Sequence, residues 1–78
     1  MNVKEIIDII YKSKKIIAKN KIKPSSNIVK DLNFDSLEYM TLVSRIEKKI
    51  KKKLDNYNID WRKFNSANNI YKILKKIK

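Results

Sequence analysis

The residue best placed to take part in a reaction is Ser36, which stands in the run DLNFDSLE at positions 31–38. Asp35 and Glu38 are three residues apart, a capping-box pattern that predicts the start of a helix at Ser36. The first turn of a helix presents unpaired backbone N–H groups and the positive end of the helix dipole, and both favour an attached phosphate. The position suits a serine hydroxyl that another protein, an enzyme, modifies, although serine is also an ordinary residue at a helix start.

The composition excludes several kinds of chemistry. The 78 residues include no histidine, cysteine or glycine. Without histidine and cysteine, the chain has no serine–histidine or cysteine–histidine pair for nucleophilic catalysis, and it lacks the commonest metal ligands. Without glycine, it has no phosphate-binding glycine loop and no dinucleotide fingerprint. The length leaves room for a single small domain, residues 1–78, and the composition leads us to expect no metal site in it.

The charge of the chain is strongly basic and unevenly distributed. The net charge is +12, from 18 lysines, two arginines and eight acidic residues. Residues 31–47 nevertheless carry four acidic residues and one arginine, a net charge of −3, while the other residues carry +15. Lysine, isoleucine and asparagine share codons rich in A and T, so base composition is a sufficient cause of the lysine excess. The segment around Ser36 is an acidic island in a basic protein.

The spacing of apolar residues predicts an all-α protein with four helices. We expect helices over about 3–19, 36–50, 58–64 and 67–77, with a loop over 20–35. The first helix carries an apolar stripe that extends through Ile16 and Ile17, and Ser66 caps the last helix. The expected inward residues of the helix over 36–50 are Leu37, Met40, Val43, Ile46 and Ile50, with Leu42 beside them. The expected anchors of the loop and of the third helix are Ile22, Ile28, Val29, Leu32, Phe34, Trp61 and Phe64.

The run DLNFDSLE resembles the attachment site of the acyl carrier protein family, in which a serine carries 4′-phosphopantetheine. The order of the predicted elements matches that family over nearly the whole chain. The resemblance implies a four-helix acyl-carrier-like bundle, with a long loop between helices 1 and 2 and a short third helix. It implies that a phosphopantetheinyl transferase moves the arm from coenzyme A to Ser36 with Mg²⁺, and that Asp35 positions the transferase or its metal. Asn33 stands where the family commonly has glycine, and asparagine tolerates left-handed backbone.

The resemblance also implies two further sets of residues. Partner enzymes would dock on the helix over 36–50, through Leu37 and Met40 as apolar contacts and Glu38 and Glu47 as acidic ones. A channel between the helices would shelter the acyl chain. Its lining would consist of residues that are first of all core: Leu42, Val43, Ile46, Ile59, Ile70 and Leu74. This sequence departs from the family at Arg45, Lys48 and Lys49, which interrupt the acidic face that most carriers have.

The function that the resemblance implies is a non-catalytic, monomeric, cytoplasmic carrier. It would move acyl groups as thioesters between acyl-transferring and synthase enzymes, with fatty acid biosynthesis, a part of lipid metabolism, as the default pathway. Polyketide, aminoacyl and D-alanyl carriers share the same serine and fold class. The basic exterior keeps such a specialised carrier, with dedicated partner enzymes, as an alternative.

The basic charge raises two other possibilities. A small helical domain could bind nucleic acid through the lysines of residues 3–19 and 48–53, with a steep dependence on salt. Arginine is scarce and no reading helix is evident, so we expect no specific nucleic-acid partner. The amphipathic segment 3–19 could instead lie on a membrane surface, but Glu5 and Asp8 interrupt it. No uncharged run approaches the ~20 residues of a membrane span.

Overall fold

The computed structural model describes residues 1–14 and 18–77. These residues form three α-helices, three single-turn 3₁₀ helices and no strand. The elements are α1 (Val3–Ser13), η1 (Lys19–Lys21), α2 (Ser36–Ile50), η2 (Leu54–Asn56), η3 (Trp61–Lys63) and α3 (Ala67–Lys76). The predicted all-α class is confirmed, whereas the predicted four-helix bundle is not, because three α-helices are present in the described part of the chain. In that part, no helix has both the length and the apolar character to cross a membrane.

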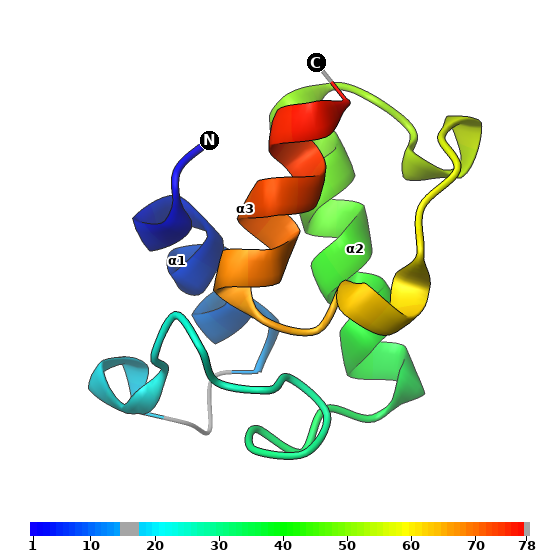
Figure 1. Cartoon of the computed structure of the whole chain (residues 1–78). Helices are drawn as coiled ribbons and strands as arrows, with labels where there is room; N and C mark the ends of the chain where they lie inside the picture. The colour runs from blue at the N-terminus through cyan, green and yellow to red at the C-terminus, as the bar shows by residue number, and fades with distance from the viewer. Residues whose placement is uncertain (15–17, 78) are drawn as a thin grey trace.

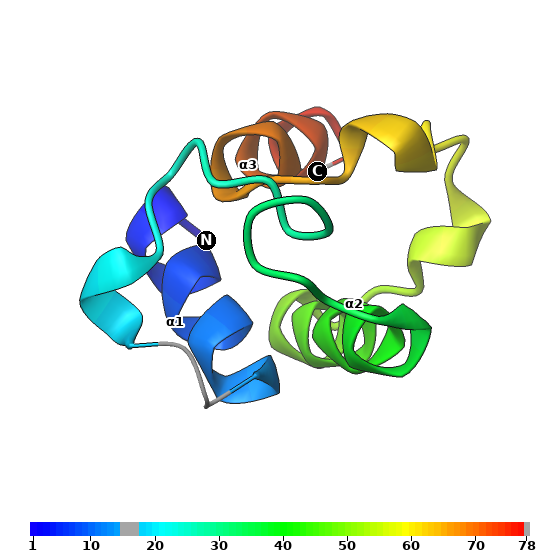
Figure 2. The same ribbon diagram turned by 90° about the horizontal axis from the view of Figure 1, so that it is seen from below.

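The three α-helices surround one apolar core (Figure 1). In this view α1 runs downward, whereas α2 and α3 both run upward. α1 packs against both of the other helices. Seen from below, the segment between η1 and α2 crosses the end of the molecule at which α2 and α3 begin (Figure 2). This arrangement places the start of α2, and therefore Ser36, at that lower end.

α1 is shorter than the apolar spacing predicts. It ends at Ser13 rather than near residue 19. Lys14 leaves helical geometry, with φ −149° and ψ 85°, and its ammonium group bonds to the segment at the start of α2. These bonds to a distant segment outweigh the local helical preference of the chain. The last residues of the predicted stripe, Ile16 and Ile17, lie outside the described residues.

One 3₁₀ turn replaces the predicted third helix over 58–64. η3 spans only Trp61–Lys63, and η2 lies before it, where the sequence predicts no helix. Asparagine and aspartate in this region favour turns over helix, and so short a segment cannot nucleate a stable α-helix alone. Of its two predicted anchors, Phe64 is fully buried and Trp61 is 38% exposed.

α2 has the predicted bounds but turns a different face to the core. Leu42 and Ile46 are fully buried, and Val43 packs half-buried against them. Leu37 and Met40 are 75% and 67% exposed, so their prediction as inward residues is wrong. The buried face follows an i, i+4 series through Leu42 and Ile46, and Leu37 and Met40 fall outside that series on the helix surface.

The core takes residues from every α-helix and from the loop before α2. Its buried members are Ile6, Ile10, Ile22, Ile28, Leu32, Phe34, Leu42, Ile46, Leu54, Phe64, Ala67, Ile70 and Leu74. Four of the five predicted loop anchors are among them, whereas Val29 is 53% exposed. Val29 sits in a turn whose backbone N–H groups bond to the Asn27 side chain, so turn chemistry sets its position.

Backbone hydrogen bonds attach the loop before α2 to the start of α3. The Ile28 N–H donates to the Asn65 carbonyl at 2.8 Å, and the Asn68 N–H donates to the Pro24 carbonyl at 3.0 Å. Ser66 caps α3 as predicted, and α3 ends at Lys76, one residue before the predicted limit. The loop is therefore a fixed part of the fold that leads to Ser36.

Candidate functional site

Ser36 is the first residue of α2 and is exposed. Asp35 directly before it is the N-cap: its side chain accepts a hydrogen bond from the Glu38 N–H at 2.8 Å. The Glu38 side chain accepts one in return from the Asp35 N–H at 3.0 Å. The predicted capping box is therefore confirmed. Because Asp35 supplies the cap, the Ser36 hydroxyl is not needed for it and stays available at the helix N-terminus.

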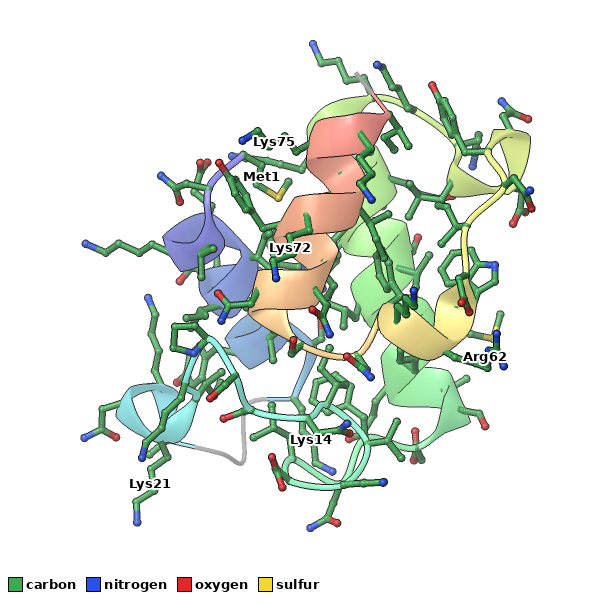
Figure 3. All side chains as sticks on the ribbon, in the orientation of Figure 1. Met1, Lys14, Lys21, Arg62, Lys72 and Lys75 are labelled. Carbon is green, nitrogen blue, oxygen red and sulfur yellow. The ribbon has the colours of Figure 1, made fainter. Side chains whose placement is uncertain are left out.

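Lys14, at the end of α1, holds the segment that leads to Ser36 (Figure 3). Its side chain is only 9% exposed, and its ammonium nitrogen lies 3.2 Å from Glu38 Oε1. The same ammonium group donates a hydrogen bond to the Asn33 carbonyl and lies 5.7 Å from the centre of the Phe34 ring. A nearly buried charge is stable only with such partners, so Lys14 fixes the parts that it joins.

The turn before Ser36 contains one left-handed residue, Asn33, with φ 56°. Asparagine adopts this conformation more readily than most residues, so the turn forms without glycine. The Phe34 N–H then donates to the Ile28 carbonyl at 3.1 Å, which closes the loop on itself. The direction in which the chain enters α2 is thus set by backbone bonds as well as by Lys14.

An open groove of about 620 Å³ begins beside Ser36, between the start of α2, the loop before it and η3. We call it the Ser36 groove. Its lining includes Ser36, Tyr39 and Met40 of α2 and Trp61 and Arg62 of η3. It therefore offers an extended ligand both aromatic and charged contacts along one path from the serine.

Aromatic residues form one wall of the Ser36 groove. The Tyr39 hydroxyl donates a hydrogen bond to the Phe64 carbonyl at 2.7 Å, and the two rings pack edge to face at 6.4 Å. The Trp61 ring lies 5.2 Å from the Phe64 ring. Burial raises the pKa of Tyr39, so its hydroxyl keeps its proton at neutral pH and continues to donate. The wall is therefore both apolar and fixed in place.

Two basic side chains, Lys30 and Arg62, also line the Ser36 groove. The Arg62 Nε lies 3.1 Å from Asp60 Oδ1. This hydrogen bond lowers the pKa of Asp60 and raises the pKa of Arg62, so the two groups stay ionised as a pair. In the described part of the chain, no carboxylate lies within 4 Å of the Lys30 ammonium. Lys30 is therefore the groove cation with the most charge available to an anion.

The predicted docking residues lie in different surroundings. Leu37 and Met40 are exposed on the first turns of α2, close to Ser36. Glu38 is held by the cap and by Lys14. Glu47 lies about two and a half turns beyond Glu38 along α2, where its Oε2 accepts a hydrogen bond from the Leu54 N–H at 2.8 Å. Both carboxylates have structural partners, and their part in docking stays a prediction.

The residues predicted to line an acyl channel belong to the single core or pack against it. Four are buried and two are half-buried; in order of position they are Leu42, Val43, Ile46, Ile59, Ile70 and Leu74. Their core role is confirmed, and their use as a channel stays a prediction.

A second groove, of about 1000 Å³, lies between α1 and α2 and was not found by sequence reasoning. Six basic and two acidic side chains line it, so we call it the basic groove. The sequence signal was present in the helical spacing of Arg45, Lys48 and Lys49, which places all three on one side of α2. The missing information was the face of α1 that lies opposite, which only the packing of the two helices determines.

The acidic residues of the basic groove are themselves paired. Asp8 Oδ1 lies 2.6 Å from the Lys19 ammonium, and Asp8 Oδ2 lies 3.4 Å from that of Lys12. The Lys19 hydrogen bond, followed by the Lys12 one, lowers the pKa of Asp8. Glu5 Oε2 lies 3.9 Å from the Lys49 ammonium. No group of acidic side chains in residues 1–14 and 18–77 is arranged to hold a metal ion.

Comparisons of the chain with protein-family models, with curated proteins and with solved structures found no match.

Proposed function

We propose that this chain is an acyl carrier protein, which carries acyl groups as thioesters on a 4′-phosphopantetheine arm attached to Ser36. The observation that carries the proposal is the exposed serine at the N-terminus of α2, directly after its capping aspartate and beside an open groove. The resemblance of the run DLNFDSLE to the attachment site of that family supports it. So does the element order, in which α1 and a long loop precede Ser36 and α3 follows its helix.

The residues around Ser36 fit such an arm. A phosphodiester on the Ser36 oxygen stands at the positive end of the α2 dipole, where unpaired N–H groups favour negative charge. Lys30 lines the same groove and supplies a further positive charge. Tyr39 and Trp61 offer aromatic surface to the apolar part of the arm. The arm supplies the thiol for thioester chemistry, which a chain without cysteine cannot provide.

Loading of the arm is a phosphoryl transfer to Ser36, catalysed by a phosphopantetheinyl transferase with Mg²⁺. The Ser36 oxygen forms the new phosphate ester and gives up its proton to the transferase. The pyrophosphate bond of coenzyme A breaks, and adenosine 3′,5′-bisphosphate leaves with the electron pair. The chain contributes an exposed hydroxyl in a fixed position, and Asp35 positions the transferase or its metal as well as capping α2.

The proposed cargo is a fatty acyl group, transferred between synthase enzymes of fatty acid biosynthesis in the cytoplasm. The apolar core between the helices, with the half-buried Val43 and Ile59 at its margin, is the part of the protein that would shelter such a chain. Polyketide, aminoacyl or D-alanyl cargo is the alternative. Incubation of the loaded protein with an acyl-activating enzyme of each class distinguishes them by the mass added.

The test is intact-mass analysis after incubation with coenzyme A, Mg²⁺ and a phosphopantetheinyl transferase of broad specificity. The parent protein gains one phosphopantetheinyl unit, and Ser36→Ala gains none. Ser44→Ala is the matched control, because Ser44 is also an exposed serine on α2, and it loads like the parent. Loading of Ser36→Ala, or no loading of a folded parent, contradicts the proposal.

The single tryptophan gives a second readout. Trp61 lines the groove that begins at Ser36, so its emission should shift when the arm is attached. The shift is absent from Ser36→Ala treated in the same way. An adduct without any change at Trp61 places the arm outside the groove and contradicts the assignment of Tyr39 and Trp61 as its wall.

A further inference from the structure

The basic groove between α1 and α2 combines a large excess of positive charge with a concave shape. Six basic and two acidic side chains line its volume of about 1000 Å³, a net charge of +4. Both carboxylates already face lysines. By contrast, no carboxylate in the described residues lies within 4 Å of Lys4, Arg45 or Lys48. These three cations have their charge available to an external partner.

The basic groove is joined to the Ser36 groove through Met40. This side chain lines both grooves and is 67% exposed. Leu37, one turn earlier on α2, is 75% exposed. A partner that covers the basic groove therefore meets an apolar contact at one end of it, next to Ser36.

We propose that the basic groove binds an acidic, amphipathic segment of a partner protein, with Arg45 and Lys48 as its main charge contacts and Met40 as its apolar anchor. Complementary charge speeds such an encounter and fixes its register, while an exposed apolar side chain gains by burial in a partner. The polarity is opposite to the acidic docking by Glu38 and Glu47 that the sequence predicts. The charge and exposure of these residues support the docking surface by themselves, whereas its use in presenting Ser36 to enzymes rests on the proposed function.

A protein segment fits this surface better than a polyphosphate does. Glu5 and Asp8 line the same groove and repel a continuous row of phosphates. The exposed Met40 and Leu37 find apolar partners in a protein segment but not along a phosphate backbone. Arginine, which reads bases and binds phosphate in a bidentate manner, occurs once among the eight charged residues of the groove.

The experiment uses a labelled peptide of about 18 residues, five helical turns, with a row of Glu beside a row of Leu. A scrambled peptide of the same composition is its control. Affinities are measured by fluorescence anisotropy at physiological ionic strength, about 0.15 M. We expect the amphipathic peptide to bind the parent protein at least threefold more tightly than the scrambled one, because only the ordered row of Leu reaches Met40 while Glu faces the cations.

Two charge-reversal variants locate the binding. Arg45→Glu with Lys48→Glu should weaken binding of the amphipathic peptide about tenfold, since it replaces attraction by repulsion at the contact. Lys72→Glu with Lys75→Glu changes the net charge equally, at the same spacing on α3 (Figure 3). It should weaken binding less than about threefold, because only long-range attraction is lost and salt screens most of it. Circular dichroism checks the fold. If either reversal unfolds, the corresponding Gln pair replaces it, with the same order of effects.

Three outcomes overturn the inference. One is equal weakening by the two variants, which leaves only net charge as the cause. Another is equal binding of the two peptides. The third is binding of duplex DNA or of phosphatidylserine vesicles at least as tightly as the peptide, with a loss confined to the Arg45 and Lys48 variant, because the groove is then a polyanion site.

The Ser36→Ala protein separates this inference from the proposed function. It has no attachment site, yet it should bind the amphipathic peptide as tightly as the parent does. A parent protein that takes no adduct but binds the peptide in the groove overturns the carrier proposal and supports the docking surface. A protein that loads at Ser36 but shows no groove-specific peptide binding overturns the docking surface alone.

Discussion

The two ends of α2 are built in different ways. At the first turn, the Asp35 and Glu38 side chains satisfy each other's backbone N–H groups. Lys14 reaches this turn from α1, and Tyr39 reaches the Phe64 carbonyl from α2. Residues far apart in sequence thus converge on the helix start that carries Ser36.

The last turn of α2 is exposed and basic. Lys48, Lys49 and the residues 51–53 are all exposed lysines. The helix ends at Ile50, and its C-cap Lys51 is left-handed, with φ 59°. Glycine adopts this conformation at no steric cost, whereas for lysine it is unfavourable. Glu47 closes this end by accepting the Leu54 N–H.

The highest positive charge and the largest number of fixing hydrogen bonds therefore lie at opposite ends of α2. The exposed lysines of residues 48–53 are the most conspicuous feature of the composition. The helix that carries them nevertheless ends at a left-handed lysine, Lys51, which is an unfavourable conformation for that residue. The Ser36 end carries little net charge and has the more elaborate set of bonds. A site that must present one atom in a fixed position needs that construction, whereas a charged docking surface needs only exposed cations on a rigid helix.

Loss of the cap should have the largest effect of the substitutions that compare the two ends. Asp35→Ala removes the acceptor for the Glu38 N–H and a negative charge at the helix start, and should lower the free energy of unfolding by roughly 1–2 kcal/mol. Ser36→Ala, one residue away, should change it by less than about 0.5 kcal/mol. Urea unfolding measures both. Equal losses would show that the Ser36 hydroxyl shares the capping role and is less available than proposed.

Removal of the Tyr39 hydroxyl should have the next largest effect. Tyr39→Phe leaves the Phe64 carbonyl without this donor and should cost about 1 kcal/mol at neutral pH. Because burial raises the folded-state pKa of Tyr39 above its ordinary value of 10.0, its contribution is fully present below pH 10.0 and is lost as the pH rises through the folded-state pKa. The stability difference between parent and variant should therefore shrink on the alkaline side.

Unfolding curves collected from about pH 7 to pH 11 test this dependence across the range in which tyrosine titrates. Tyr57→Phe, at the C-cap of η2, is the control for general alkaline effects. A stability difference between parent and Tyr39→Phe that grows with pH would contradict the assigned direction of the pKa change.

Local signals in the sequence predicted the helix that carries the site. The Asp35–Glu38 capping box and the apolar spacing after it gave the bounds of α2, and Ser66 gave the start of α3. The same local pattern predicted that Ser36 is the first residue of this helix. These features depend on residues within three or four positions of one another, so the sequence contains them directly.

The features that depend on distant residues were not predictable in this way. α1 ends at Ser13, and the next residue, Lys14, bonds through its side chain to residues near the start of α2, a contact that no local pattern encodes. The outward direction of Leu37 and Met40 depends on which face of α2 meets the core. The basic groove depends on how α1 packs beside α2. In each case the feature depends on tertiary packing, which no local pattern in the sequence specifies.

The smallest expected effect is a gain in the free energy of unfolding, and it tests the left-handed residues at both ends of α2. Lys51→Gly relieves a left-handed lysine and should raise the free energy of unfolding by about 0.5 kcal/mol. Asn33→Gly, at the left-handed position before Ser36, should gain less, because asparagine already tolerates that conformation. Lys53→Gly, at an extended residue with φ −89°, is the control and should only destabilise. Thermal unfolding ranks the three. A larger gain at Asn33 than at Lys51 would place the greater backbone strain beside Ser36 and reverse the comparison between the two ends.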